Sequence, residues 1–157
     1  MKNITFLFLA LAWSIASCKP DPAPKPDDRE PPKQYSYWVV NEDSFRTSDV
    51  KTALGLGRCD LYSDGVNSFG FTFFTGEGKL PKHGYFPLAH DNGENPNYVY
   101  TGFNYKDNLF IVASNESSSI QPSSINNKAR YTLPPTWFVN YYNHNDSVLI
   151  HGVFNEP

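Results

Sequence analysis

The sequence predicts an all-β fold, namely an antiparallel β-sandwich of about eight strands, with a small β-barrel as the alternative. Large apolar residues alternate with small or polar ones at a period of two, as in Phe69-Gly70-Phe71-Thr72-Phe73. Short runs of this kind recur about every 8–12 residues between turn-forming residues, which is typical of sandwiches and barrels. No window has the apolar spacing of an amphipathic helix, because Gly, Asn, Ser and Pro interrupt the sequence throughout.

Eight segments are expected to be strands. A bulge is expected at Gly57, and short polar connections predict hairpins over 104–108 and 143–146. The long polar stretches 89–96 and 115–127 are expected to be loops. In chain order, the predicted strands are 37–40, 50–62, 69–74, 97–103, 109–114, 128–133, 136–142 and 147–154.

Composition divides the chain into three parts. Residues 1–17 hold one basic side chain and an apolar run shorter than the roughly 20 residues that cross a bilayer. Residues 18–34 contain six prolines and eight charged side chains but almost no apolar ones, which predicts an extended tether. Residues 35–157 are dense in aromatic residues and long enough to bury a core as one domain.

The stretch Ile15-Ala16-Ser17-Cys18 follows the apolar run. It resembles the lipobox of bacterial lipoproteins, where a signal peptidase cuts before a cysteine that carries lipid. The resemblance implies that residues 1–17 are a signal peptide, that Cys18 is lipidated, and that the domain is held to a membrane by its N-terminal lipid. Lys19 replaces the Asp that retains many lipoproteins in the inner membrane, so we expect the outer membrane, on its surface or periplasmic face.

The alternative to a lipobox is an ordinary secretory signal, in which case Cys18 and Cys59 are free to form a disulfide. If Cys18 carries lipid, Cys59 has no partner within the chain. It is then expected to be a small buried apolar residue and not a reactive thiol, since no His or cationic cluster surrounds it in sequence.

Sequence motifs for catalysis are absent, and we expect no enzyme, no cofactor and no metal. The four histidines lack the spacing of a zinc site. The loop Asp91-Asn92-Gly93-Glu94-Asn95 offers oxygen ligands without the spacing of a calcium loop, so a solvated turn is favoured. Residues 35–157 carry eight basic and twelve acidic side chains, which argues against nucleic acid as a partner.

Aromatic side chains are the strongest functional indication. Tyr98 and Tyr100 alternate with residues that belong in the core, so they are expected to face solvent. On 136–142, the alternation is interpreted as Trp137, Val139 and Tyr141 inward, and Phe138, Asn140 and Tyr142 outward. Exposed aromatic rings stack on sugar rings or anchor protein partners. The candidate ligand-binding residues are therefore Tyr98, Tyr100 and Tyr142.

The domain as a whole is similar to small all-β lipoproteins of unknown function, a likeness that carries over no site residue. The leading hypothesis is a lipid-anchored binding module of the cell envelope, for a glycan or a protein. The alternative is a structural or accessory subunit of an outer-membrane complex, and a small hydrolase with paired carboxylates is a third. Asp146-Ser147-Val148 also resembles a three-residue O-glycosylation site of exported bacterial proteins.

Overall fold

The computed structural model describes residues 34–55, 57–90 and 95–157, which lie within a compact unit spanning Lys33–Pro157. These residues form strands and no helix, so none of their elements is a helix long and apolar enough to cross a membrane. The eleven strands are β1 (Ser36–Val40), β2 (Asp43–Thr47), β3 (Lys51–Leu54), β4 (Cys59–Tyr62), β5 (Ser68–Phe73), β6 (Phe86–Ala89), β7 (Val99–Tyr105), β8 (Asn108–Val112), β9 (Ser119–Ile125), β10 (Lys128–Asn140) and β11 (Ser147–Asn155).

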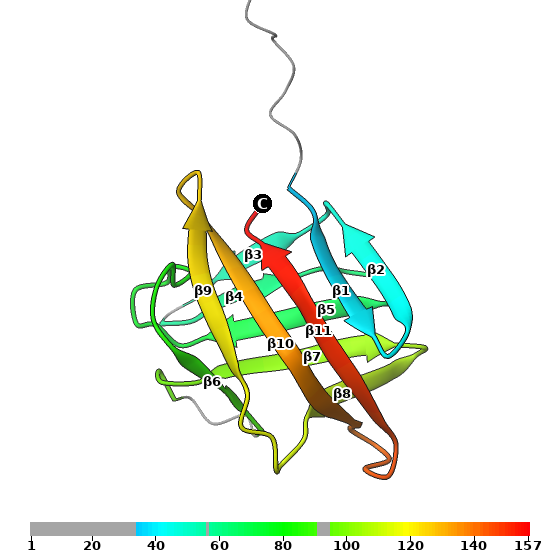
Figure 1. The fold of residues 1–157 in the computed structure, drawn as a ribbon. Helices are drawn as coiled ribbons and strands as arrows, with labels where there is room; N and C mark the ends of the chain where they lie inside the picture. Colours follow the sequence, from blue (N-terminus) through cyan, green and yellow to red (C-terminus); the bar gives the residue numbers. More distant parts are fainter. Residues whose placement is uncertain (1–33, 56, 91–94) are drawn as a thin grey trace, which may run out of the picture. The chain divides into compact units, whose positions relative to one another are not determined.

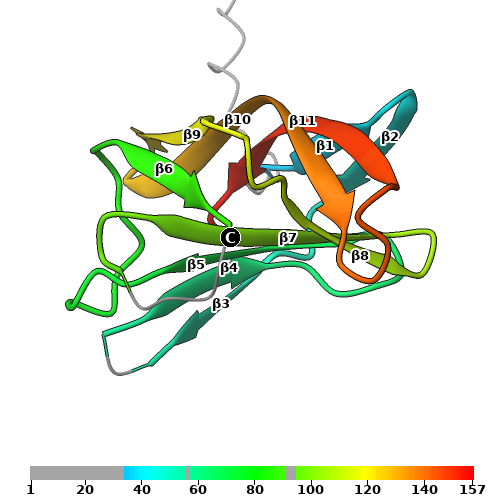
Figure 2. The same cartoon turned by 90° about the horizontal axis from the view of Figure 1, so that it is seen from below.

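All eleven strands belong to one mixed sheet, in the order β2-β1-β11-β10-β9-β6-β7-β5-β4-β3, with β8 pairing to both β10 and β7. The sheet folds into two layers that face one another, one containing β2, β1, β11, β10 and β9, the other β3, β4, β5 and β7 (Figures 1 and 2). β6 and β8 each pair with a strand of both layers. The all-β prediction is confirmed, but the pairing is not wholly antiparallel, because β6 and β7 run parallel.

The core between the layers is aromatic. Phe69, Phe71 and Phe73 all point inward from β5, as their alternation predicted. Phe154 of β11 is fully buried and packs its ring 4.6 Å from that of Phe69 and 4.7 Å from that of Phe71. Trp38 of β1 joins the same cluster. Burial of these large rings is the main source of stability for a fold of this size.

Several strand boundaries differ from the prediction. The segment 50–62 is a hairpin of β3 and β4, closed by hydrogen bonds between Gly55 and Arg58, and not one bulged strand. The predicted strands 128–133 and 136–142 are one continuous strand, β10, whose register with β11 shifts at the Pro134-Pro135 pair. β2, β6 and β9 were not predicted, and β9 occupies most of the expected loop 115–127.

The predicted facing of β10 is wrong. Phe138 and Asn140 are buried, while Trp137 and Tyr141 are each about half exposed. The register of β10 against β11 shifts before Thr136. Beyond this shift, the residues that face inward lie one position later than a strict alternation continued from the first half of the strand would place them. Asn140 is accommodated in the interior because its amide donates to Asp146 and its oxygen accepts from the following turn.

Glu116 fastens the connection between β8 and β9 to β10. Its carboxylate accepts from the backbone N–H of Trp137 at 2.9 Å and from the hydroxyl of Ser118 at 2.7 Å, as well as from the N–H of Ser117 and of Ser118. Burial raises the pKa of Glu116, but these four hydrogen bonds outweigh it and hold the pKa below its ordinary value of 4.5.

We expect Glu116→Gln to lower the free energy of unfolding by about 1–2 kcal/mol at pH 7, because charge-assisted hydrogen bonds become neutral ones. Since the pKa is depressed in the folded state, this stabilisation is present above pH 4.5 and is lost as the pH falls through the folded value. Urea denaturation of both proteins at pH 7 and pH 3 checks this. The difference in the free energy of unfolding between the two proteins should be smaller at pH 3 than at pH 7. A difference that is equal at both pH values would contradict the role given to the carboxylate.

Candidate functional site

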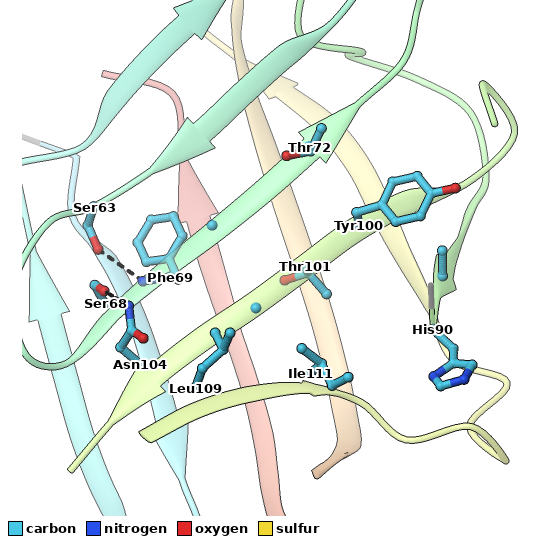
Figure 3. Close-up of a pocket in the computed structure, with 13 residues that line it drawn as sticks. Ser63, Ser68, Phe69, Thr72, His90, Tyr100, Thr101, Asn104, Leu109 and Ile111 are labelled. Carbon is cyan, nitrogen blue, oxygen red and sulfur yellow. Dashed lines mark hydrogen bonds between the residues drawn. The ribbon is translucent and has the colours of Figure 1, made fainter. Parts of the chain in front are cut away.

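A groove of about 350 Å³ lies on the outer face of the layer that contains β5 and β7 (Figure 3). Its floor is made by Gly70 and Gly102, which are direct cross-strand partners. Their neighbours along the strands point into the core, so the two glycines face solvent with no side chain. The groove is lined by Ser63, Ser68, Phe69, Gly70, Thr72, Ala89, His90, Tyr100, Thr101, Gly102, Asn104, Leu109 and Ile111.

One end of the groove is aromatic. Tyr100 is the cross-strand partner of Thr72, so their side chains stand on the same outer face. The Tyr100 ring packs edge-on against Phe74, with ring centroids 5.5 Å apart. This contact fixes the ring and leaves it half-buried, and His90 lies beyond it, after the end of β6 (Figure 3).

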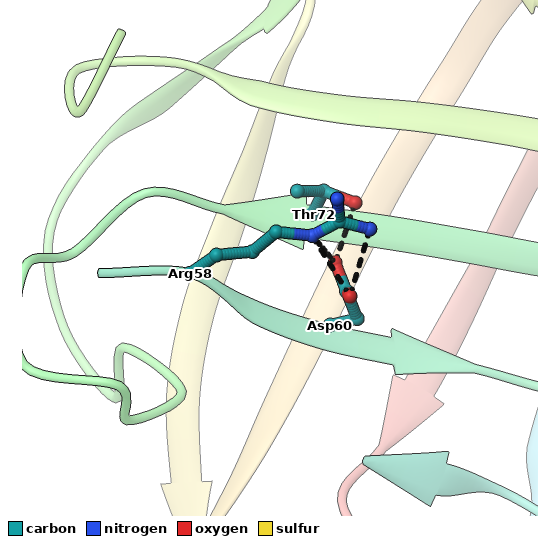
Figure 4. Close-up of polar contacts among 3 residues, drawn as sticks. All are labelled: Arg58, Asp60 and Thr72. Carbon is teal, nitrogen blue, oxygen red and sulfur yellow. Dashed lines mark hydrogen bonds and ion pairs between the residues drawn. The ribbon is translucent and has the colours of Figure 1, made fainter. Parts of the chain in front are cut away.

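Thr72 is oriented by an ion pair next to the groove (Figure 4). Its hydroxyl donates to a carboxylate oxygen of Asp60 at 2.7 Å. Asp60 in turn accepts from Arg58, whose Nη2 is 2.9 Å from its Oδ2. Because the Thr72 proton is committed to Asp60, the lone pairs of its hydroxyl remain to accept a hydrogen bond from a ligand.

The other end of the groove is polar, and one side of it is aliphatic. Asn104 donates from its side-chain amide to the hydroxyl of Ser68 at 2.9 Å, which fixes the orientation of the amide. Ser63 closes this end, where its hydroxyl accepts from the N–H of Phe69. Leu109 and Ile111 are the β8 partners of Asn104 and Gly102, and they form an apolar side wall.

Of the three predicted site residues, the structure places Tyr100 in the groove. Tyr100 lines the groove, whereas Tyr98 precedes β7 and Tyr142 lies in the connection between β10 and β11. Tyr98 is 38% exposed and Tyr142 82% exposed, so both face solvent. Among the described aromatic contacts none joins two of these three rings, and Tyr142 packs instead against Tyr141.

The glycine floor was missed by sequence reasoning. Gly70 and Gly102 each looked like a small residue within a strand, and only the register of β5 against β7 brings them side by side. The sequence does contain a signal for such a floor, because glycine within a strand often marks the close approach of another group. The signal lies in Gly70 of Phe-Gly-Phe and Gly102 of Tyr-Thr-Gly-Phe.

Cys59 was expected to be buried and is fully buried in the core at the start of β4. Burial raises the pKa of its thiol to about 11, with smaller contributions from Asp60 and Glu156. The thiol is therefore neutral and unreactive at ordinary pH. Its proposed lipidated counterpart, Cys18, lies outside the described residues.

Of the loop Asp91-Asn92-Gly93-Glu94-Asn95, which offers oxygen ligands in its sequence, residues 91–94 lie outside the described part of the chain. Within residues 34–55, 57–90 and 95–157, no three His, Cys, Asp or Glu side chains come together as a metal site would require. Ser147, in the possible glycosylation motif, is exposed at the start of β11, and its modification stays a prediction.

No family model matches this chain, and neither a curated protein nor a solved structure gives a significant match.

Proposed function

We propose that this chain is a lipid-anchored module of the cell envelope that binds a neutral glycan in the groove over β5 and β7. The observation that carries the proposal is the Gly70–Gly102 pair. It opens a floor on a sheet face that is otherwise covered by side chains, between an oriented aromatic ring at one end and an oriented amide at the other.

The chemistry of the lining suits a sugar. A pyranose ring has an apolar face of C–H groups and a rim of hydroxyls, so it needs a flat apolar surface next to hydrogen-bond partners. Tyr100 and Ile111 supply apolar surface, and Thr72 and Asn104 supply polar atoms in fixed orientations. Among the described residues that line the groove there is no Asp, Glu, Lys or Arg side chain, which favours an uncharged ligand.

An extended peptide fits this groove less well. Peptides that bind β-sheets as an added strand need an unpaired edge that offers N–H and C=O groups. β5 is paired with β4 on one side and β7 on the other, and β7 is paired with β5 and β8. The backbone N–H and C=O groups of the strands under the groove are therefore already hydrogen-bonded within the sheet. A ligand of this groove must therefore be held through side chains.

Anchoring rests on the sequence around Cys18, which we propose carries lipid at the outer membrane, with residues 19–34 as the tether. We further infer that the folded sheet is best described as a β-sandwich whose layers are bridged by β6 and β8. In a sandwich the core fills the interior, and ligands are met by the outer faces and loops. A site on an outer face agrees with this architecture.

A binding role is proposed in preference to catalysis. Glycoside hydrolysis uses two carboxyl groups on either side of the scissile bond. Among the described residues that line the groove there is no carboxylate, and the nearby Asp60 is committed to Arg58 and Thr72. The groove can therefore hold a glycan, but its described residues offer no pair of carboxyl groups to cleave one.

Calorimetric titration of the full-length protein with neutral oligosaccharides tests the proposal. The panel contains cello-, manno-, xylo- and N-acetylchito-oligosaccharides, in a zwitterionic detergent without a sugar headgroup. We expect one series to bind and Tyr100→Ala to weaken it about tenfold, because stacking and ring burial are lost. Tyr37→Ala, which removes an exposed ring from β1 in the other layer, is the control and should bind normally. No binding to any series would reject the glycan role.

The accessory-subunit alternative has one observation in its favour. On the outer face of the β1–β11–β10 layer, Tyr37 pairs across strands with Val153, Val39 with His151, and Leu149 with Trp137. This face is partly apolar, and Tyr37 and Trp137 are about half exposed. Crosslinking of intact cells through a photoreactive residue at position 37 tests it, and a single specific adduct is the result that the alternative requires.

A further inference from the structure

We propose that the groove continues beyond Leu109 onto the exposed rings of Tyr141 and Tyr142, so that the site takes a chain of about four sugar units and not a single terminal sugar. The inference rests on the proposed function and extends it by naming an oligosaccharide chain as the ligand. Its basis is the position, the preorganisation and the dimensions of the surface that adjoins the polar end of the groove.

Continuity is provided by β8. Leu109 lines the groove, and its backbone oxygen accepts from the N–H of Tyr141 at 2.8 Å. The β8–β10 ladder also pairs Ile111 of the side wall with Val139. Because Phe138 and Asn140 point inward, Val139 and Tyr141 stand on the outer face together with Leu109 and Ile111. The outer surface therefore runs from the side wall of the groove to Tyr141 without a break in the sheet.

The two tyrosine rings form a fixed platform. They pack edge to face, with centroids 5.2 Å apart and an angle of 88°, although Tyr141 is 51% and Tyr142 82% exposed. Buried Asn140 holds the turn beneath them, because its side-chain oxygen accepts from the N–H groups of Tyr142 and Asn143. Exposed rings on a turn that is already ordered lose little conformational entropy when a ligand stacks on them.

The dimensions set the length of the ligand. Four residues along β7 separate Tyr100 from Asn104, and two strand spacings separate β7 from β10. Together these place the two aromatic ends on the order of 15–20 Å apart. That is the length of about four linked pyranose rings, with Tyr100 under one end and the Tyr141–Tyr142 pair under the other.

The experiment is a length series on the full-length protein, in the same zwitterionic detergent. Di-, tetra- and hexasaccharides of the series that binds best are titrated by calorimetry. We expect affinity to rise from disaccharide to tetrasaccharide and then to level off. Tyr142→Ala should weaken the tetrasaccharide and hexasaccharide about three- to tenfold and leave the disaccharide unchanged. Tyr85→Ala, which removes another highly exposed tyrosine, from the connection before β6, should change neither.

The outcomes separate the two proposals. If Tyr100→Ala weakens binding but Tyr142→Ala does not, and affinity is flat beyond the disaccharide, the groove binds glycan and the extension is wrong. If no series binds, the proposed function fails and the extension with it. Tyr142 is so exposed that its loss should not unfold the protein, and unchanged thermal unfolding of Tyr142→Ala verifies this.

Discussion

Phe154→Ala is expected to lower the free energy of unfolding by about 3–5 kcal/mol, the range for removing a large buried aromatic side chain. Phe154 is fully buried, and its ring lies within 4.6–6.3 Å of the rings of Trp38, Phe69, Phe71 and Phe103. These rings come from both layers of the sheet. Truncation of Phe154 removes a packing partner from each of these rings and leaves a cavity among them. The rigid strands around this cavity restrict its collapse.

Urea denaturation measures this effect, with the slope of the transition compared between variants so that a change in stability is distinguished from a change in the unfolded state. Leu149→Ala, on the outer face of the same strand, is the control and should cost far less, because Leu149 is only half-buried. If Phe154→Ala does not fold, Phe154→Leu should still fold, at a cost of about 1 kcal/mol. A loss below 1 kcal/mol for Phe154→Ala would contradict its central place in the core.

Strands with large inward residues were predictable from sequence, and the others were not. β5, β7, β8 and β11 were all found, because rings or branched side chains alternate with small or polar residues in each. β2, β6 and β9 are short or polar, and β9 contains Pro122. Their pairing is determined by neighbours far away in sequence, and no local periodicity records it.

Turn chemistry would have revealed β9. Asn126 and Asn127 have φ values of 51° and 62°, the left-handed pair that closes a tight hairpin between β9 and β10. Asn is one of the few residues that adopts this conformation readily. The Asn-Asn pair lies within a polar stretch whose composition predicts a loop, and the hairpin signal is confined to these two residues.

The facing of β10 was not determined by its pattern. Trp137 and Tyr141 carry large aromatic side chains as Phe138 does, so both phases of the alternation offer large side chains. The register shift after Leu133 and the buried hydrogen bonds of Asn140 decide between them. The same difficulty limits site prediction. Tyr100 was found from alternation on β7, but the groove beside it depends on a register between residues that are 32 positions apart.

Gly70→Val is expected to abolish glycan binding, with at least a tenfold loss of affinity, while leaving the protein folded. A Cβ at Gly70 would meet no atom within 4 Å, and the backbone there is not in the left-handed region that favours glycine. Valine is a favourable strand residue, so stability should be unchanged or slightly raised. Its branched side chain would rise from the floor of the groove into the space that a sugar ring must occupy.

Calorimetric titration of Gly70→Val with the best-binding oligosaccharide, together with its thermal unfolding, measures both effects. Gly70→Ala should give a smaller loss, since it adds one methyl group to the floor. Ser44→Val adds the same valine to an exposed position on β2, away from the groove, and should bind normally.

Normal binding by folded Gly70→Val would remove the groove from consideration as the site. A stable Gly70→Val protein that no longer binds the oligosaccharide would support the groove as the binding site. Nothing in the backbone or packing around Gly70 requires glycine, so the missing side chain would then be a requirement of the ligand and not of the fold. Gly102 is a weaker test of the same point, because a Cβ there comes within 3.3 Å of Leu109 and would disturb the side wall as well as the floor.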